Sequence, residues 1–367
     1  REQAASWLRQ FLQSELGQPY ADVIANEDIL NFRGVASSPV AEESKARLGA
    51  EAQPASSLPG NPEVRKVLME RIAKEGRIGF RDFMDISLYH VTEDGRGIGY
   101  YSGGAVRIGS IETTGKHFIT YPEYMPELFG RTMAKQITQM WELLDRPSVF
   151  YIVEMGAGNG TMAKNILASL RAEGPQEFTS AVRYVIIEVS PELAERQKAT
   201  LAHEALPVTW IQTSAVNIQL NDIEGVFVSN ELSSAFSVHV AKERGGELKE
   251  LYLTAPHPDD SSGRFIAVYD TPSCEAIYDY VRMFKRTMDR AYAKSLLDGP
   301  GLPVNTASIR WQEGIAKSLR RGYVITIDYG SKGSKPDWHS YQKSDRASIR
   351  TYNAQGRGGD LLVDVGN

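Results

Sequence analysis

One short stretch of the sequence combines an apolar run, an acidic residue and three alternating glycines. Glu154 directly follows the run Val149–Val153, and the glycines are Gly156, Gly158 and Gly160. An apolar, β-branched run of this length is typical of a buried parallel strand, and the glycines after it permit a tight turn into a helix. The pattern therefore predicts a strand–turn–helix unit of an α/β sheet, whose turn exposes bare backbone to a nucleoside ligand.

The glycine spacing narrows the choice of nucleoside. A dinucleotide-binding turn requires G-x-G-x-x-G, whose third glycine would fall where this chain has Thr161. A P-loop is excluded as well, because no Lys-Ser or Lys-Thr pair follows to hold a phosphate. S-adenosylmethionine fits better, since it carries no phosphate and needs a close turn, an acid and an apolar slot for adenine. The alternative interpretation is a structural glycine-rich turn without a ligand.

Further apolar runs follow at the pace of a parallel α/β sheet. They are Tyr184–Glu188, Val208–Ile211, Gly225–Glu231 and Gly322–Gly330. Strand and helix patterns alternate, which predicts a doubly wound parallel sheet. The carboxyl ends of parallel strands share one edge, where such sheets bind ligands, so we expect the polar strand ends to converge there. These strand ends are Glu154, Glu188, Gln212, Thr213, Ser214, Asn230 and Glu231.

The pattern of apolar residues and breakers divides the chain into five segments. Residues 1–61 form an N-terminal helical segment with a Pro- and Ser-rich linker, and residues 62–147 form a helical lid region. Residues 148–240 form the α/β core that binds the cofactor, and residues 241–305 an inserted hairpin and helix that cap it. Residues 306–367 continue the core, which we expect to be incomplete because the alternation stops early.

Helices are predicted where apolar residues recur at helical spacing. These stretches are 62–83, 127–145, 161–170 and 277–297. Strands at 248–252 and 265–269 flank a polar turn, and we expect them to form an antiparallel hairpin. The Gly- and Tyr-rich stretch 95–115 is expected to be irregular and to lie near the site.

Composition limits the class of protein and its partners. The chain of 367 residues carries 41 basic and 46 acidic residues, so its formal charge of −5 makes nucleic acid a poor candidate partner. No run approaches the ~18 apolar residues of a transmembrane helix. The single cysteine, Cys274, excludes an intrachain disulfide and a cysteine metal cluster, and it suits a reducing compartment. The chain begins at Arg1 rather than Met, which fits a removed targeting segment or a piece of something longer.

Other stretches stand in a fixed order around the glycine turn. They are Gly99–Tyr101, His117–Glu123, Leu128–Gly130, Glu188–Pro191 with Gln197, Asn230–Leu232 and Asp328–Gly330. In this order and spacing the chain, over roughly residues 75–355, resembles the MidA-like family of class I methyltransferases, which includes the mitochondrial complex I assembly methyltransferase. The resemblance implies a class I methyltransferase sheet of seven strands, Rossmann-like, with an inserted cap, preceded here by an N-terminal helical extension. It also implies S-adenosyl-L-methionine as the cofactor and S-adenosyl-L-homocysteine as its product.

The resemblance assigns roles residue by residue. The three glycines of the turn would line the methionine and ribose, Glu188 would hold the ribose hydroxyls, and Asn230 with Glu231 would close the site. The loop Thr120–Glu123 would form the wall near the transferred methyl. The expected cofactor-binding residues are Glu154, Gly156, Gly158, Gly160, Glu188, Thr120, Pro122, Ser214, Asn230 and Glu231.

The chain departs from the family's pattern at two positions. Ser234 stands where the family carries an aspartate, and His117 stands where it tends to carry aspartate before phenylalanine. An arginine acceptor has a pKa above ~12 and favours carboxylates that orient and deprotonate it, so Ser234 counts against an arginine acceptor. The residues before about Met69 have no counterpart, and the chain stops near Asp364, short of the family's usual C-terminal section.

Methyl transfer from a sulfonium requires in-line attack by the acceptor and removal of at most one proton, without a metal or a covalent nucleophile. His239, just beyond the fourth strand, and His117 are the candidate general bases for a hydroxyl acceptor. Glu123 is the alternative base or the partner of a histidine. Each residue also has a plainer interpretation, as a structural histidine or as an acid flanking a helix.

Three functions stay open. The sequence favours O-methylation of a small molecule or carrier-bound intermediate by histidine- or carboxylate-assisted attack. The second is protein-arginine N-methylation of the complex I assembly kind, and the third is a non-catalytic module that binds S-adenosylmethionine. We expect a small-molecule, carrier-bound or protein substrate, no nucleic acid and no membrane span. The expected compartment is the cytoplasm, with the mitochondrial matrix as the alternative.

Overall fold

The computed structural model describes residues 60–109, 117–257 and 263–329, the pairs 352–353 and 356–357, and residue 362. Contacts divide the chain after Ser57, and the unit that contains these residues is Leu58–Asn367. The helix and linker expected before residue 60, and most of the core continuation expected after residue 329, lie outside the described residues. Within the described ranges, no helix combines the length and apolarity that crossing a membrane requires.

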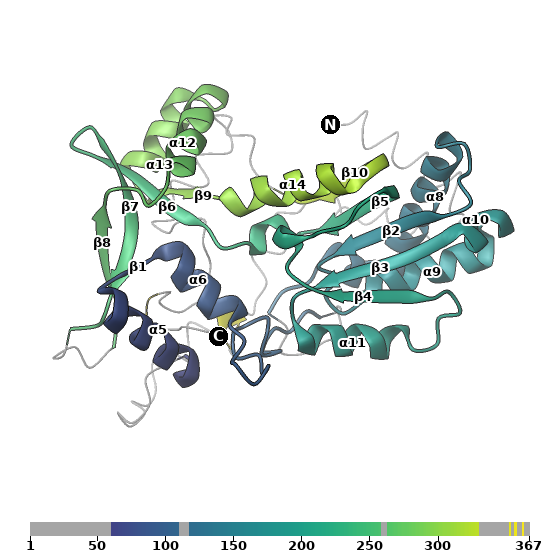
Figure 1. The fold of residues 1–367 in the computed structure, drawn as a ribbon, viewed down its shortest axis with the longest axis horizontal. Helices are drawn as coiled ribbons and strands as arrows, with labels where there is room; N and C mark the ends of the chain where they lie inside the picture. Colours follow the sequence, from purple (N-terminus) through teal and green to yellow (C-terminus); the bar gives the residue numbers. More distant parts are fainter. Residues whose placement is uncertain are drawn as a thin grey trace, which may run out of the picture. The chain divides into compact units, whose positions relative to one another are not determined.

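Five parallel strands form the central sheet, in the order β10-β5-β2-β3-β4 (Figure 1). Their bounds are β2 Phe150–Met155, β3 Val182–Glu188, β4 Val208–Gln212, β5 Ile223–Asn230 and β10 Leu319–Ile327. The chain first runs outward from β2 to β4 and then crosses to β5 on the other side of β2. The strand order therefore reverses beside β2, which confirms the predicted doubly wound sheet and puts its switch point at the glycine turn.

Helices cover both faces of the central sheet. They are α8 Pro126–Leu143, α9 Thr161–Glu173, α10 Gln176–Ala181, α11 Pro191–Leu201 and α14 Thr306–Ser318. Side chains alternate between the faces of a strand, so Ile152 and Ile186 pack against α8, α9 and α10. Val153 and Phe227 point the opposite way and pack in one cluster with Trp311 of α14. Near-continuous apolar strands of this kind are buried on both sides.

A second sheet is antiparallel and is built largely from the chain between β5 and β10. Its strands are β1 Ile78–Gly79, β6 His239–Arg244, β7 Glu247–Thr254, β8 Ile266–Asp270 and β9 Leu302–Val304. Strands β1, β6 and β8 pair with β7, and β9 pairs with β6, so the predicted hairpin is the pair β7 and β8. Helices α5 Pro62–Glu75 and α6 Phe80–Tyr89 pack with Leu253 of this sheet, and α12 Glu275–Thr287 and α13 Arg290–Asp298 pack around Ala241.

Two helices that the periodicity predicts as continuous are broken in the structure. The stretch 62–83 divides because α5 ends at Glu75, where the C-cap Gly76 has a φ of 76° that is outside the helical range, and because β1 precedes α6. The stretch 277–297 divides because Asp289 accepts hydrogen bonds from the N–H groups of Ala291 and Tyr292 and so begins α13. The apolar stripe continues across both breaks, which is why spacing alone missed them.

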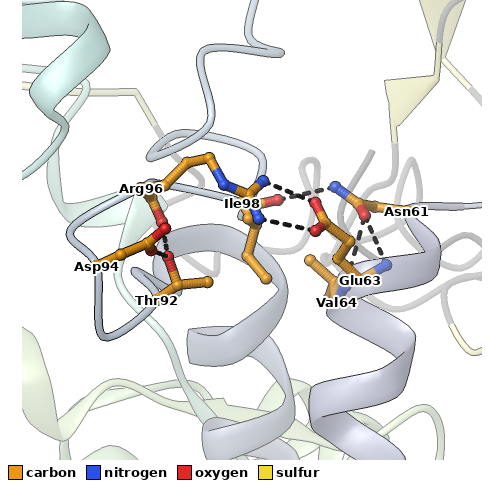
Figure 2. Close-up of polar contacts among 7 residues, drawn as sticks. All are labelled: Asn61, Glu63, Val64, Thr92, Asp94, Arg96 and Ile98. Atoms are coloured by element: carbon orange, nitrogen blue, oxygen red, sulfur yellow. Dashed lines mark hydrogen bonds and ion pairs between the residues drawn. The ribbon is translucent and has the colours of Figure 1, made fainter.

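The start of α5 holds the loop that follows α6 (Figure 2). Asn61 accepts hydrogen bonds from the N–H groups of Glu63 and Val64, and its amide donates to the carbonyl of Ile98 at 2.9 Å. Arg96 adds two contacts of 2.8 Å to the Glu63 carboxylate. Because solvent screens this exposed ion pair, the Asn61 cap is the stronger restraint. The loop that it anchors leads to aromatic residues of the candidate site.

Candidate active site

The glycine turn between β2 and α9 adopts backbone angles that side chains disfavour. The φ angles are 70° at Gly156, 56° at Gly158 and 82° at Gly160. A Cβ atom at Gly156 would lie 2.7 Å from Leu232 Cδ1, and one at Gly158 would lie 3.1 Å from Ile108 Cδ1. Leu232 and Ile108 therefore lie directly against the turn, and a side chain at either glycine would occupy the space that they border.

Glu154 lies at the end of β2 and is only 1% exposed. The Tyr184 hydroxyl donates to its Oε2 at 2.6 Å. Burial raises the pKa of Glu154 to about 7, and the charge of Glu188 adds to the rise while the Tyr184 hydrogen bond opposes it. A carboxyl group that titrates near neutrality responds strongly to a cation brought close to it.

Gln197 links the ends of β2 and β3. Its Nε2 donates to the Gly158 carbonyl at 3.0 Å and to Glu188 Oε2 at 2.8 Å. The other carboxylate oxygen of Glu188 accepts the Ser190 N–H at 2.9 Å. Burial is the main cause that raises the pKa of Glu188, which these hydrogen bonds oppose. The carboxylate is thereby held beside the glycine turn, at the carboxyl edge of the sheet.

Polar groups also gather at the ends of β5 and β10. The buried Asn230 Oδ1 has no hydrogen-bond partner among the described residues. Glu231 has a φ of 53°, and its N–H donates to the Ile327 carbonyl at 2.7 Å. Burial, and next the charge of Asp328, raise the pKa of Glu231. Ser233 Oγ donates to Asp328 Oδ2 at 2.9 Å, so two carboxylates lie near each other at this edge.

The predicted wall lies beside the turn. Thr120 precedes the short helix α7 Tyr121–Tyr124, and Pro122 within it is buried. Glu123 Oε1 accepts hydrogen bonds from Asn159 Nδ2 at 3.0 Å and from Thr161 Oγ1 at 2.8 Å. Glu123 therefore ties this wall to the glycine turn and to the start of α9.

His117 lies in the loop that passes over the turn. Its N–H donates to the Arg107 carbonyl at 2.8 Å, and its Nδ1 lies 2.6 Å from the hydroxyl of Tyr100. Burial, with the charge of Arg107, lowers the pKa of His117, so the neutral ring is favoured. Nearby, the rings of Tyr89 and Tyr101 stack with centroids 5.4 Å apart. The structure therefore puts His117 in an aromatic group above the carboxyl edge.

Two of the predicted site residues make their contacts away from the glycine turn. His239 is 6% exposed, its Nδ1 lies 2.7 Å from Glu250 Oε1, and both residues line a cavity of the second sheet. Among the described residues, no contact joins His239 to the glycine turn. Ser214 accepts the Val216 N–H at 3.3 Å and so caps the short helix η3 Ala215–Asn217, which turns its hydroxyl toward its own backbone.

Several residues of the site were given no role from the sequence. They are Ile108, Asn159, Gln197, Leu232 and Asp328. Gln197 carried a usable signal, because a glutamine with no exposed surface stands on the apolar face of α11. Ile108 carried none, since its place depends on a loop that returns to the turn from a distant part of the chain. Among the described residues, no group of three or more His, Cys, Asp or Glu is placed to hold a metal.

Comparison with known sequences gives one family and a set of similar relatives. A family model described as "Putative S-adenosyl-L-methionine-dependent methyltransferase" matches residues 132–367. The mitochondrial protein arginine methyltransferase NDUFAF7 of Mus musculus is 29% identical over 302 residues, which cover 78% of this chain. The homologue from Drosophila melanogaster is 25% identical over 331 residues, covering 83% of this chain and 68% of the relative. This chain spans 64% of the length of the mouse protein.

Comparison with solved structures agrees with the architecture. A COG1565 superfamily member from Burkholderia thailandensis, crystallised with S-adenosyl-homocysteine, has a TM-score of 0.64 at 27% identity. The match covers 84% of this chain and 74% of that one. A native crystal structure of a COG1565 protein from the same organism, at 24% identity and a TM-score of 0.60, has the same fold.

Proposed function

Because this chain belongs to the family of S-adenosyl-L-methionine-dependent methyltransferases whose model matches residues 132–367, we propose that it methylates an arginine side chain of a protein. The observation that carries the choice of acceptor is the pair of carboxylates, Glu231 and Asp328, at the ends of β5 and β10. The mouse and Drosophila relatives are named protein arginine methyltransferases, which supports the same choice. The hydroxyl acceptor that the sequence favoured receives no support from these relatives.

The carboxyl edge of the central sheet suits S-adenosylmethionine as the cofactor, which supplies an electrophilic methyl group on a sulfonium. The turn at Gly156 and Gly158, which carries no side chain, and the unpartnered Asn230 Oδ1 are features that a bound nucleoside would use. Glu188 is the residue that would hold the ribose hydroxyls. Glu154, whose pKa lies near 7, would favour a positively charged ligand by taking its ionised form.

Asp328 would supply the carboxylate that an arginine acceptor favours and that Ser234 lacks. A guanidinium presents its N–H donors in a planar fork that carboxylates bind in pairs. Ser234 supplies no carboxylate, but Asp328 does, and Ser233 fixes one of its oxygens by a hydrogen bond of 2.9 Å. Glu231 has a raised pKa, which makes it a better acceptor for the proton that the reaction releases than an ordinary surface glutamate. Glu231 and Asp328 are therefore proposed to orient and deprotonate the guanidinium.

A hydroxyl acceptor remains the second candidate because of His117. Its pKa is lowered, so a neutral ring is available to accept a proton, and Tyr100 orients Nδ1 at 2.6 Å. Glu123, whose Oε1 already accepts two hydrogen bonds, would then position the wall of the site. His239 would act only if its ring reached this edge from the second sheet.

The direct test is to identify the methylated atom. Purified chain is incubated with isotopically labelled S-adenosylmethionine and either arginine-containing peptides or hydroxylated metabolites, and mass spectrometry locates the label. Label on an arginine nitrogen would support the proposal, and label on an oxygen would replace it with the second candidate. Binding of the cofactor without transfer to any acceptor would instead favour the non-catalytic module.

Asp328→Asn separates acceptor recognition from cofactor binding. We expect kcat/KM for an arginine peptide to fall about tenfold or more, as loss of one charge-assisted hydrogen bond implies, with unchanged affinity for S-adenosylmethionine. Ser234→Asp should raise the same kcat/KM, because it adds a carboxylate beside Ser233. Asp298→Asn, at the exposed end of α13, is the matched control. Equal kcat/KM in wild type and Asp328→Asn would remove these carboxylates from acceptor recognition.

The curated relatives also bear on the compartment. The mouse and Drosophila proteins are named mitochondrial, which supports the mitochondrial alternative over the cytoplasm. We therefore propose a mitochondrial location and a protein substrate. Locating the tagged full-length protein by microscopy would test the first, and exclusion from mitochondria would overturn it.

A further inference from the structure

Residues 103–109, which we call the strap, are held to the central core by side-chain donors. Arg196 of α11 donates from Nη1 to the Val106 carbonyl at 3.0 Å and from Nη2 to the Gly104 carbonyl at 2.6 Å. Asn159, in the glycine turn, donates to the Ile108 carbonyl at 3.0 Å. Two side chains of the core therefore hold three carbonyls of one short segment.

The chain just before the strap is fixed on both sides. Tyr101 donates its N–H to the Leu88 carbonyl of α6 at 2.8 Å, and its own carbonyl accepts the Ser190 hydroxyl at 2.7 Å. The strap itself has glycine near both ends, and Gly104 has a φ of 70°. Because glycine backbone accepts a wide range of angles, the strap can change position while Tyr101 stays in place.

The strap borders the glycine turn to which the cofactor is assigned. Ile108 Cδ1 lies 3.1 Å from the point that a Cβ atom on Gly158 would occupy. Val106 has no exposed surface and packs in one cluster with Leu193 of α11, which holds the middle of the strap against the core. A ligand that enters the turn at Gly158 must pass Ile108, so the position of the strap controls access to the turn from this side.

The remaining backbone bonds of the strap do not tie it to the core. The Arg107 carbonyl accepts the His117 N–H at 2.8 Å, and the Gly109 N–H donates to the Phe118 carbonyl at 3.2 Å. Both bonds join the strap to residues 117–118, so both can be kept if the two segments move away from the turn together.

Arg196 makes two of the three hydrogen bonds that hold the strap to the core. Hydrogen bonds from an ionised donor are stronger than those between neutral groups. Glu192 Oε1 lies 3.7 Å from Arg196 Nε, but both side chains are partly exposed, at 54% and 34%, and solvent screens this ion pair. The strap carbonyls are therefore the main partners of the guanidinium.

We propose that the strap opens to let the cofactor enter and leave the glycine turn, and that Arg196 is the positioning residue that holds it closed. Opening breaks the two bonds of Arg196 and the bond of Asn159, and it leaves α11 and the central sheet intact. Lid movements of this kind set the rate of ligand exchange in many enzymes. The proposal rests on the cofactor and not on the methyl acceptor, so failure of the arginine assay does not affect it.

The test is the exchange rate of S-adenosylhomocysteine, the reaction product, which binds without reacting. Labelled ligand bound to the full chain is chased with excess unlabelled ligand, which gives the dissociation rate constant. Calorimetry gives Kd, and the two values together give the association rate constant. In Arg196→Gln we expect both rate constants to rise about tenfold, as loss of hydrogen bonds from a charged donor implies, while Kd stays close to the wild-type value. Both rates rise because the strap is closed before and after passage and only its opening becomes easier.

Two further variants make the result specific to the strap. Arg196→Lys keeps the charge but lacks the planar fork that reaches two carbonyls, so its rate constants should rise less than those of Arg196→Gln. Lys198→Gln is the matched control, because Lys198 lies on the same helix, is 48% exposed and pairs with Glu195. It should exchange ligand at the wild-type rate. If Arg196→Gln fails to fold, as urea unfolding would show, Arg196→Lys carries the test with the same expected direction.

Two kinetic results would overturn the proposal. One is an unchanged dissociation rate constant in Arg196→Gln. The other is a Kd weakened by the same factor as dissociation, with association unchanged, because Arg196 would then support affinity and not passage.

Hydrogen exchange measures the opening without any ligand. The Val106 N–H donates to the Tyr100 carbonyl at 3.2 Å, within the part of the chain that must move. Its exchange should be faster in Arg196→Gln than in the wild type, whereas exchange of the Tyr101 N–H should not change. Equal exchange at Val106 in the two proteins would show that Arg196 does not hold the strap.

Discussion

The pKa values of three glutamates in the candidate active site are raised by the same physical cause. Burial is the largest effect that raises the pKa of Glu154, Glu188 and Glu231. A buried carboxylate without a cation is unfavourable, so each of these groups gains when a positive charge approaches. S-adenosylmethionine carries a sulfonium, and a guanidinium acceptor carries a charge as well. We therefore expect a cationic ligand to stabilise the ionised forms of these glutamates.

The pKa of Glu154 leads to a testable pH dependence of cofactor binding. Ionised Glu154 favours the cationic cofactor, and protonation below its pKa of about 7 competes with binding. Affinity for S-adenosylmethionine should therefore rise with pH, by about tenfold per unit below pH 7, and level off above it. Calorimetry between pH 5 and 8 measures this, and Glu154→Gln should be nearly independent of pH. Wild-type affinity that stays constant over this range would contradict the role given to Glu154. Glu177→Gln, at an exposed position, should behave as the wild type.

A side chain at Gly158 is expected to block cofactor binding, in addition to the backbone strain that a side chain causes at any glycine of positive φ. Gly158→Val places a side chain against Ile108 and in the space over the turn, so cofactor binding should be abolished. Gly246→Val is the matched control, because Gly246 also has a positive φ, 83°, but its Cβ would meet no atom within 4 Å. Both variants should lose similar stability from backbone strain, as measured by urea unfolding. Wild-type affinity in Gly158→Val would refute the assignment of this turn.

Strands marked by an apolar run in the sequence could be predicted. Strands that form only because another strand pairs with them could not. The strands of the central sheet are apolar runs, and their polar ends could be placed at one edge from the sequence alone. By contrast, β9 is the three-residue run Leu302–Val304 and exists because β6 pairs with it. Strand β6 ends in the charged run Lys242–Arg244, which gives no apolar alternation to detect.

The same limit applies to the candidate site. The glycines, Glu154, Glu188, Asn230 and Glu231 belong to strand ends and could be found by pattern. Asp328 directly follows β10, so the same rule could have placed it at this edge. Ile108 reaches the region from a loop far away in the chain, and its contact with the turn depends on tertiary structure. The sequence placed His239 just beyond a strand of the central sheet, and the structure shows that it is the first residue of β6 in the second sheet. Its role as a base stays a prediction.

The side chain of Asn61, which caps α5, should contribute measurably to the free energy of unfolding. Asn61→Ala removes the acceptor of the first N–H groups of α5 and the donor to Ile98. We expect a loss of about 1 kcal/mol in the free energy of unfolding, measured by urea denaturation. Asn221→Ala, at an exposed position in a loop, is the control and should stay within about 0.5 kcal/mol of the wild type. Equal stability of Asn61→Ala and the wild type would show that the cap does not anchor this region.

At the scale of the whole molecule, the raised pKa values of the buried glutamates predict that the free energy of unfolding declines as pH rises toward neutral. The pKa of Glu154 is raised from 4.5 to about 7, so the folded state retains a proton that the unfolded chain loses. This contribution is complete below about pH 4.5 and is lost as pH rises to about 7, by roughly 3 kcal/mol. Glu188 and Glu231 act in the same direction. Glu250 has a lowered pKa, so its contribution is present above 4.5 and is lost at lower pH.

The measurement is the free energy of unfolding in urea at pH values from 4 to 8, without cofactor. The wild type should be most stable near pH 5, and Glu154→Gln should lose much of the decline between pH 5 and 7. Identical profiles for the two proteins would show that Glu154 does not set this dependence. Added S-adenosylmethionine should flatten the wild-type profile, since it stabilises the ionised group.

The pairing of β10 with β5 has a consequence for how the protein is made. During synthesis β5 leaves the ribosome before the second sheet and α14, and its outer edge, with Val226–Val228, stays without its partner until Leu319–Ile327 emerge. An open apolar strand edge is a template for pairing with another chain. Nascent chains are therefore exposed to aggregation throughout the translation of the second sheet, and a chain cut short before Leu319 would carry that exposed edge permanently.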